Sequence, residues 1–423
     1  MWRRWIETWY ISYALLGAAI AGLAPILLPL MVIRIGGAAE VGFVMAAFSL
    51  GGLTAPLWGN LADRYRLHRW LLTLGLAVAA VGLVIFPFTS ILTVWLGLAI
   101  LQGGGAAAAS TVANLFVVEA HPRAEWDERI GWLQTFYAAG QVGGLLLAGA
   151  LGQVDPRGGL LVAGGMAILA VLPGWWTTRT PLAPLRPKPV PLHPPRHTEW
   201  PAVSPQRVFH HLTPEAMRRL GPALRSPFGL FLVVWLLSFG GSAALFSLYP
   251  VLMQEAYGIS PAVSSIGFAV AAGLGLALYS PAGRWSEGFG PSRVLQLALG
   301  VRVLAFLGLF ALGISPSGAL GWLALPGFAF VVLAWSLLSV SGTTLTARLS
   351  PVGEGVGMGV FNATTALASV VGAAAGGLVA GTMGYVEVSA LAAAGNAVGL
   401  VLSLAIRADR QDGAKADPSH GNG

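Results

Sequence analysis

Residues 59–69 read GNLADRYRLHR, and residues 283–293 read GRWSEGFGPSR. Each stretch follows an apolar segment and carries a glycine, an acid four residues later and an arginine six residues after the acid. The first copy uses Gly59, Asp63 and Arg69, and the second uses Gly283, Glu287 and Arg293. The same charged turn after the second span of each of two apolar halves indicates a duplicated membrane bundle.

Composition indicates that the chain lies in a lipid bilayer. Hydrophobic residues make up 56% of the 423 residues and charged residues 10%, too little polar surface to cover a soluble globule of this length. Most of the 57 glycines lie within apolar runs, where small residues let helices approach closely. The absence of cysteine excludes disulfides and cysteine metal sites.

Twelve apolar segments have the length of about 20 residues that a helix needs to cross a bilayer. Six precede a long polar break and six follow it. The sequence therefore predicts an all-α membrane protein with twelve transmembrane helices in two six-helix pseudo-symmetric bundles. The predicted spans are 9–33, 40–61, 69–88, 90–118, 129–152, 158–177, 227–252, 260–282, 293–313, 318–346, 357–382 and 385–406.

Four parts follow along the chain. We expect an N-terminal six-helix bundle over 1–178, a proline-rich cytoplasmic linker over 179–225, a C-terminal six-helix bundle over 226–406 and a polar cytoplasmic tail over 407–423. The prolines of the linker remove helix donors and favour extended backbone.

The distribution of basic residues predicts the topology. With both termini in the cytoplasm, every lysine and arginine except Arg34, Arg157 and Arg302 falls on the cytoplasmic side or in the linker and tail. We therefore expect a multi-pass protein of a bacterial-type inner, or plasma, membrane.

The first charged turn resembles a motif of the major facilitator superfamily, and the resemblance extends over essentially the whole chain. The residues that match are Gly59, Leu61, Asp63, Arg64 and Arg69. Arg66 stands where the family has a glycine, and the second copy keeps that glycine as Gly290. The resemblance implies a transporter that works by alternating access.

Two further patterns resemble the drug-efflux branch of that family. The fourth span carries Gln102, Gly103, Gly105 and Ala107, with Ala99 where the family pattern has an arginine. The fifth span carries Gly131, Gly140 and Gly144 at the spacing typical of antiporters, without the usual proline.

The charged turn is expected to act as a conformational latch. Asp63 follows a helix end, where a carboxylate accepts hydrogen bonds from a facing helix N-terminus. The resemblance implies that this is the N-terminus of the eleventh span, near Gly355 and Gly357. The alternative is that these charges serve only solvation and topology. The latch candidates are Gly59, Asp63, Arg64, Arg69, Gly283, Glu287 and Arg293.

Glycines of the fifth and eleventh spans are expected to supply close, sliding contacts as the bundles rock. The candidates are Gly140, Gly144, Gly372 and Gly376, together with Gly377 and Gly381 of the same eleventh span. Tight packing without movement is the alternative.

Arg302 is the one ionisable residue deep within a predicted span, which makes it a functional candidate. Its side chain could instead snorkel toward the cytoplasmic face. Carboxylates occur at span ends and none near a span centre, where a proton-relay acid is expected.

Uncharged polar and aromatic residues are the candidates for a substrate cavity without fixed charge. Gln134, Tyr137 and Gln141 share one helix face, and a polar stripe on an apolar helix faces protein or water. Hydrogen bonding between helices without substrate contact is the alternative. The candidates are Tyr13, Gln102, Asn114, Gln134, Tyr137, Gln141, Trp235, Tyr249, Trp335 and Asn362.

These observations predict a secondary transporter that exports a small amphipathic or neutral solute in exchange for protons. A facilitator or symporter for sugars or other nutrients is the alternative, and a transporter-like receptor or assembly factor that moves nothing is a second. We expect a monomer whose partners are a small-molecule substrate, the lipid bilayer and protons, and not nucleic acid. No cofactor, metal site or enzymatic activity is expected, because no nucleophile, base and orienting group occur together.

Overall fold

The computed structural model describes residues 6–55, 57–58, 68–121, 125–177, 222, 224–315, 318–351 and 354–406, and over these residues it contains helices and turns but no strand. Most of the first charged turn, the linker and the tail lie outside these residues. The N-terminal half consists of α1 (Tyr10–Leu16), η2 (Gly17–Leu23), α2 (Ala24–Ile33), α3 (Ala38–Gly52), α5 (His68–Ile85), η3 (Phe86–Phe88), α6 (Leu92–Ala120), α7 (Trp126–Val154) and α8 (Pro156–Thr177).

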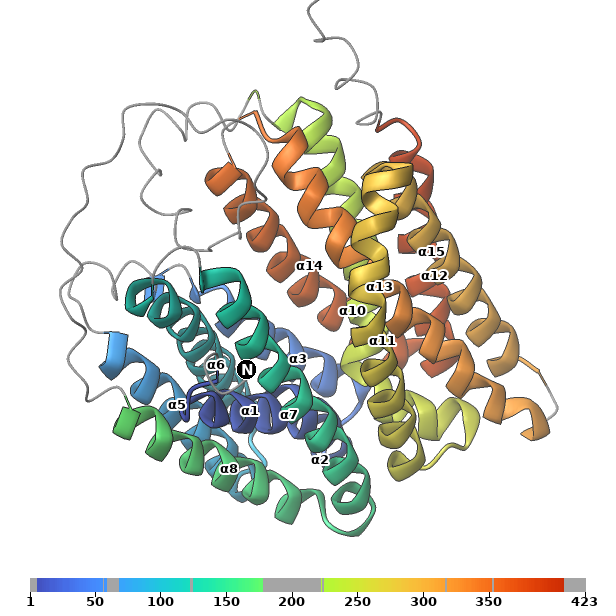
Figure 1. Cartoon of the computed structure of the whole chain (residues 1–423). Helices are drawn as coiled ribbons and strands as arrows, with labels where there is room; N and C mark the ends of the chain where they lie inside the picture. Colours follow the sequence, from blue (N-terminus) through green and yellow to red (C-terminus); the bar gives the residue numbers. More distant parts are fainter. Residues whose placement is uncertain are drawn as a thin grey trace, which may run out of the picture.

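The C-terminal half repeats this plan with six long helices (Figure 1). They are α10 (Pro227–Tyr257), α11 (Pro261–Phe289), α12 (Pro291–Gly313), α13 (Ala324–Leu349, preceded by the 3₁₀ helix η6, Gly318–Leu323), α14 (Glu354–Thr382) and α15 (Tyr385–Ser403).

The predicted twelve-helix, all-α fold is confirmed. Eleven helices within the described residues are long and apolar enough to cross a membrane. The twelfth, α3, is apolar over Ala38–Gly52, and much of the rest of predicted span 40–61 lies outside the described residues.

The first span differs from the continuous α-helix that its apolar run suggests. Its middle, Gly17–Leu23, is a π-helix, which closes hydrogen bonds over five residues instead of four. Pro25 follows directly and cannot donate to the carbonyl four residues earlier, so a wider turn before it avoids that lost bond. Gly17 and Gly22 lie directly against the backbone of α7, where a Cβ would clash.

Turn chemistry explains the tight connections of the C-terminal half. Gly258 ends α10 with φ of 67°, a left-handed conformation that favours glycine. Ser260 then caps α11, with Pro261 at the first helical position. Gly290 separates α11 from α12, and its φ of 89° also favours glycine.

Equivalent glycines pack equivalent helices within each half. In the N-terminal half, Gly140 and Gly144 of α7 lie against the backbone of Ala14 and Ala18 in the first span. In the C-terminal half, Gly372 and Gly376 of α14 lie against the backbone of Gly240 and Ala244 in α10. A Cβ at any of the four glycines would clash with that backbone, which follows the duplication expected from the sequence.

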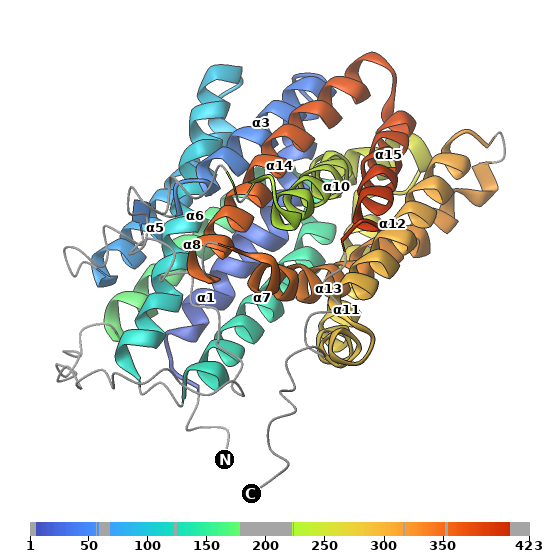
Figure 2. The same ribbon diagram turned by 90° about the horizontal axis from the view of Figure 1, so that it is seen from above.

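The two halves meet mainly along two helix pairs, α3 with α14 and α7 with α11, and α10 adds contacts to α2 and α3 (Figures 1 and 2). Gly42 and Gly377 face each other closely, and a Cβ on Gly42 would lie 2.6 Å from the Gly377 Cα. Gly149 lies against Ala262 and Ser265. These contacts lie where α3 and α11 begin and where α7 and α14 end. In Figure 1 the halves diverge toward their other end.

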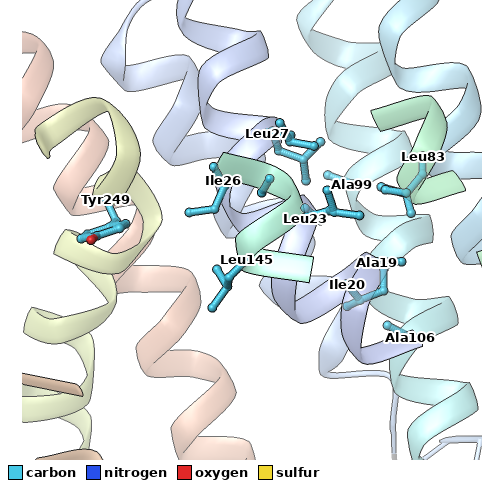
Figure 3. Packing of buried hydrophobic residues seen from close by; sticks show 14 of the residues in the cluster. Ala19, Ile20, Leu23, Ile26, Leu27, Leu83, Ala99, Ala106, Leu145 and Tyr249 are labelled. Carbon is cyan, nitrogen blue, oxygen red and sulfur yellow. The ribbon is translucent and has the colours of Figure 1, made fainter. Parts of the chain in front are cut away.

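Buried side chains of span one, α5, α6 and α7 form the core of the N-terminal half, and Tyr249 lies apart from them on α10 of the other half (Figure 3). A cluster of charged side chains lies at the end of the N-terminal half where the two halves diverge. Glu7 Oε1 lies 2.8 Å from Arg129 Nη1 and 2.7 Å from His121 Nε2, and Arg129 Nε donates to Glu125 Oε2 at 2.9 Å. The cluster connects the starts of α1 and α7 with the end of α6.

Candidate functional site

A cavity of about 450 Å³ lies between the two halves. The N-terminal half contributes residues of span one, α3 and α7, and the C-terminal half contributes residues of α10 to α14. This volume suits a small organic molecule. Aromatic rings dominate the wall, and they are Phe48, Phe239, Phe246, Tyr249, Phe268, Tyr279 and Trp335.

One face of α10 supplies the centre of the wall. Phe239, Ser242, Phe246 and Tyr249 follow one another at steps of three, four and three residues, so their side chains project from the same side of the helix. This spacing was visible in the sequence. Of these four residues only Tyr249 was predicted, because phenylalanine and serine are common in apolar spans and do not stand out there as cavity residues.

Tyr249 presents its ring and not its hydroxyl to the site. Its ring stacks on Phe328 at a centroid distance of 4.0 Å and meets Phe268 edge-on at 5.3 Å. The hydroxyl donates to the Ser264 carbonyl at 2.8 Å. The cavity therefore gains an apolar surface from a residue with a polar tip.

Arg302 places a charge in this otherwise mostly apolar wall. Its side chain is 2% exposed and belongs to the cavity lining. Nη1 donates to Ser242 Oγ at 2.9 Å, Nε donates to the Val331 carbonyl at 3.3 Å, and Cζ lies 5.8 Å from the centroid of Trp335. The side chain does not snorkel to a membrane surface, and the expectation of a cavity without fixed charge is wrong.

The predicted cavity residues divide into groups. Gln141, Tyr249 and Trp335 line the cavity. Tyr13, Asn114, Gln134 and Tyr137 gather elsewhere in the N-terminal half: the rings of Tyr13 and Tyr137 are 4.9 Å apart, and Gln134 donates to Asn114 Oδ1 at 3.3 Å. Because Gln134 and Tyr137 share a face of α7 with Gln141, this polar group continues toward the cavity.

Three predicted residues belong to neither group. Gln102 is fully buried, and its amide has no hydrogen-bond partner in the described part of the chain. Trp235 donates to Thr365 Oγ1 at 2.8 Å and lies behind the cavity wall, where its ring contacts the rings of Phe239 and Trp335. Asn362 is exposed on α14.

The second charged turn is helical. Gly283 and Glu287 lie in the last turns of α11, which continues to Phe289, and Arg293 lies in the first turn of α12. The predicted turn after residue 282 is therefore wrong in place, because Gly290 alone makes the break. Of the first copy, Gly59, Asp63 and Arg64 lie outside the described residues, as does the side chain of Arg69.

Ser242, Ser336 and Ser49 also line the cavity and were not predicted from the sequence. The described residues contain no group of three histidine, aspartate or glutamate side chains that could hold a metal ion. No aspartate or glutamate occurs among the described residues of the cavity lining.

The model of the Major Facilitator Superfamily matches residues 9–354. The chain belongs to the Major Facilitator Superfamily. It is therefore a multi-pass membrane protein of a transporter family. A comparison with curated proteins by sequence finds no match.

Solved structures of transporters share the fold at low sequence identity. A point mutant of the nucleoside transporter NupG superposes with a TM-score of 0.70 at 13% identity, covering 94% of this chain and 98% of the other. A D-xylose-proton symporter gives 0.67 at 14% identity, covering 94% and 96%. A bacterial homolog of the human lysosomal transporter Spinster, in an inward-facing and occupied conformation, gives 0.61 at 17% identity, covering 94% and 93%.

Proposed function

We propose that this protein carries a small amphipathic solute across the membrane by alternating access, with the cavity between its halves as the binding site. The observation that carries the proposal is that both halves contribute to one cavity, while their close glycine contacts in the described part of the chain all lie at one end. Two bundles that rock about such a site expose it to each side in turn.

The contacts between the halves fit an inward-open state. Both termini and the 179–225 linker are assigned to the cytoplasm because the basic residues gather there. In that orientation α3 begins, and α14 ends, at the outer face, so Gly42 and Gly377 close the outer side. The Spinster homolog with the same fold is also described as inward-facing.

The wall favours an amphipathic solute over a sugar. Aromatic rings cover much of the cavity, and polar contacts are limited to a few hydroxyls, Gln141 and Arg302. A polyol would leave many hydroxyl groups without partners against these rings, and each buried unpaired polar group costs about 1–3 kcal/mol.

For direction and coupling we propose export in exchange for protons, in a plasma membrane and as a monomer. The support is the glycine spacing of the fifth span, which resembles antiporters. The described cavity lining has no carboxylate, so the acid that binds the coupled proton is proposed to lie outside it, with Asp63 and Glu119 as candidates. The alternative is symport, in which the solute and the proton move in the same direction.

Transport of a panel of amphipathic solutes by purified protein in liposomes tests the proposal. Saturable flux that responds to an imposed proton gradient is the expected result, and the sign of the response separates antiport from symport. The absence of flux for every solute under every gradient would favour the non-transporting receptor.

A further inference from the structure

Arg302 is a buried positive charge without a negative partner among the described residues. Its side chain is 2% exposed near the middle of α12, and no carboxylate of the described chain pairs with it. A charged group in an apolar interior is costly unless it is paired, and such residues in membrane spans mark functional sites.

The hydrogen bonds of Arg302 do not require an arginine. Ser242 Oγ also donates to the Ser238 carbonyl at 2.8 Å and accepts from Asn396 Nδ2 at 3.2 Å. Val331 lies in the interior of α13, where the helix supplies a donor to its carbonyl. Both acceptors therefore keep a partner without Arg302, and an apolar side chain of similar length would serve packing equally well.

The guanidinium has five donors, and two are used by Ser242 and Val331. Beside it lie the ring of Trp335 and, at a centroid distance of 5.4 Å from that ring, Phe239. The cavity thus offers one cation next to flat apolar surfaces. No second base occurs in the described lining, which disfavours polyanions.

We propose that the substrates are amphipathic monoanions, and that a carboxylate of the solute pairs with Arg302 while its aromatic or apolar body lies against Trp335 and Phe239. This inference rests on the proposed transport function for the place of binding, and it narrows the substrate class. The solute supplies the counter-charge that the described lining lacks, and a bidentate carboxylate–arginine pair fixes its orientation.

Three probes of the same body and different charge test the proposal: naphthoate, naphthamide and naphthylmethylamine. Their dissociation constants are measured by thermal stabilisation of the purified full-length chain. The variants are Arg302→Met, which removes the charge at similar length, and Arg302→Lys, which keeps it. Arg34→Met is the matched control, because Arg34 is exposed at the end of α2.

Naphthoate should bind the natural chain about tenfold to a hundredfold more tightly than naphthamide, which corresponds to a hydrogen-bonded charge. Arg302→Met should abolish that preference, Arg302→Lys should retain part of it, and Arg34→Met should leave it unchanged. Equal binding of the three probes, preference for the amine, no binding of naphthoate, or a preference that survives in Arg302→Met would overturn the proposal.

Flux of the same probes in liposomes separates this inference from the proposed function. Transport of naphthoate and naphthamide at equal rates that do not depend on Arg302 would keep the carrier and remove the anion site. Arg302-dependent binding of naphthoate without any flux would keep the anion site and remove the carrier.

Discussion

At the scale of single residues, chemistry in the cavity comes from a few side chains with distinct tasks. Arg302 supplies charge, the aromatic residues of α10 and α13 supply apolar surface, and Gln141 supplies an uncharged polar group from the opposite half. Because the cavity is formed by both halves, a solute that contacts Gln141 and Arg302 together bridges them. Such a solute would couple its binding to the relative position of the halves.

Replacing Gln141 by alanine should weaken solute binding about twofold to tenfold, the range expected for one neutral hydrogen bond. The thermal unfolding temperature should change little, because Gln141 is only half-buried. Titration of a transported solute into the natural chain and into the Gln141→Ala variant measures the effect. Gln254→Ala, at an exposed position near the end of α10, is the control. Equal affinity in the Gln141 and Gln254 variants would remove Gln141 from the site.

Arg302→Met should leave the unfolding temperature of the solute-free protein unchanged or raise it. Removing an unpaired buried charge relieves its desolvation cost, and the acceptors of Arg302 keep other partners. Thermal unfolding in detergent measures this. A large fall in unfolding temperature would show that Arg302 is required for folding, and would contradict the inference that Ser242 and the Val331 carbonyl keep other partners without it.

Arg129 is the contrasting case, because its charge is paired. Arg129→Met would leave Glu7 and Glu125 without a base that both contact, and should destabilise the protein by about 1–3 kcal/mol. Arg157→Met, at an exposed position on α8, should have little effect in the same unfolding measurement. Similar stability of the two variants would contradict a structural role for the cluster.

The position of Arg302 explains what sequence alone could and could not predict at this scale. Its depth in a span marked it as functional, but whether it faces the cavity depends on how α12 is rotated against α10 and α13. From residue 297 to residue 313 the ninth span is apolar on all sides apart from Arg302, so this part of its sequence gives no periodicity that would fix the rotation.

At the scale of helices, the span order and the duplication were predictable because each span is long and apolar. The π-helix of the first span was not, since an apolar run has no polar face to reveal a change of helical period. The sequence also did not show which glycines pack within a half and which lie between the halves. Gly140 and Gly144 pack within one half, whereas Gly42 and Gly377 lie between the halves.

Enlarging Gly42 should therefore affect movement. Gly42→Leu would place side-chain atoms against Ala373 and Gly377, prevent closure of this end and stop flux. Gly308→Leu is the matched control, because no atom lies within 4 Å of a Cβ at that position. Flux in liposomes measures the effect, and solute binding checks that the cavity is intact. Normal flux in Gly42→Leu would mean that this contact does not need to close.

At the scale of the whole molecule, the two halves form a bundle that is closed at one end and diverges at the other (Figure 1). Sequence could predict the halves but not their relative position, because the same twelve helices serve every state of the cycle. The latch role of Asp63 stays a prediction from the sequence, because Asp63 lies outside the described residues.

Distances between spin labels on the two halves test alternating access most directly, and a chain without cysteine allows labels at chosen positions. Exposed pairs are available at both ends: Glu128 with Glu287 at the diverging end, and Ile35 with Met383 at the closed end. When a transported solute and a proton gradient are supplied, the Glu128–Glu287 distance should shorten and the Ile35–Met383 distance should lengthen in the same fraction of molecules. Distances that stay fixed at both ends while solute is transported would contradict alternating access.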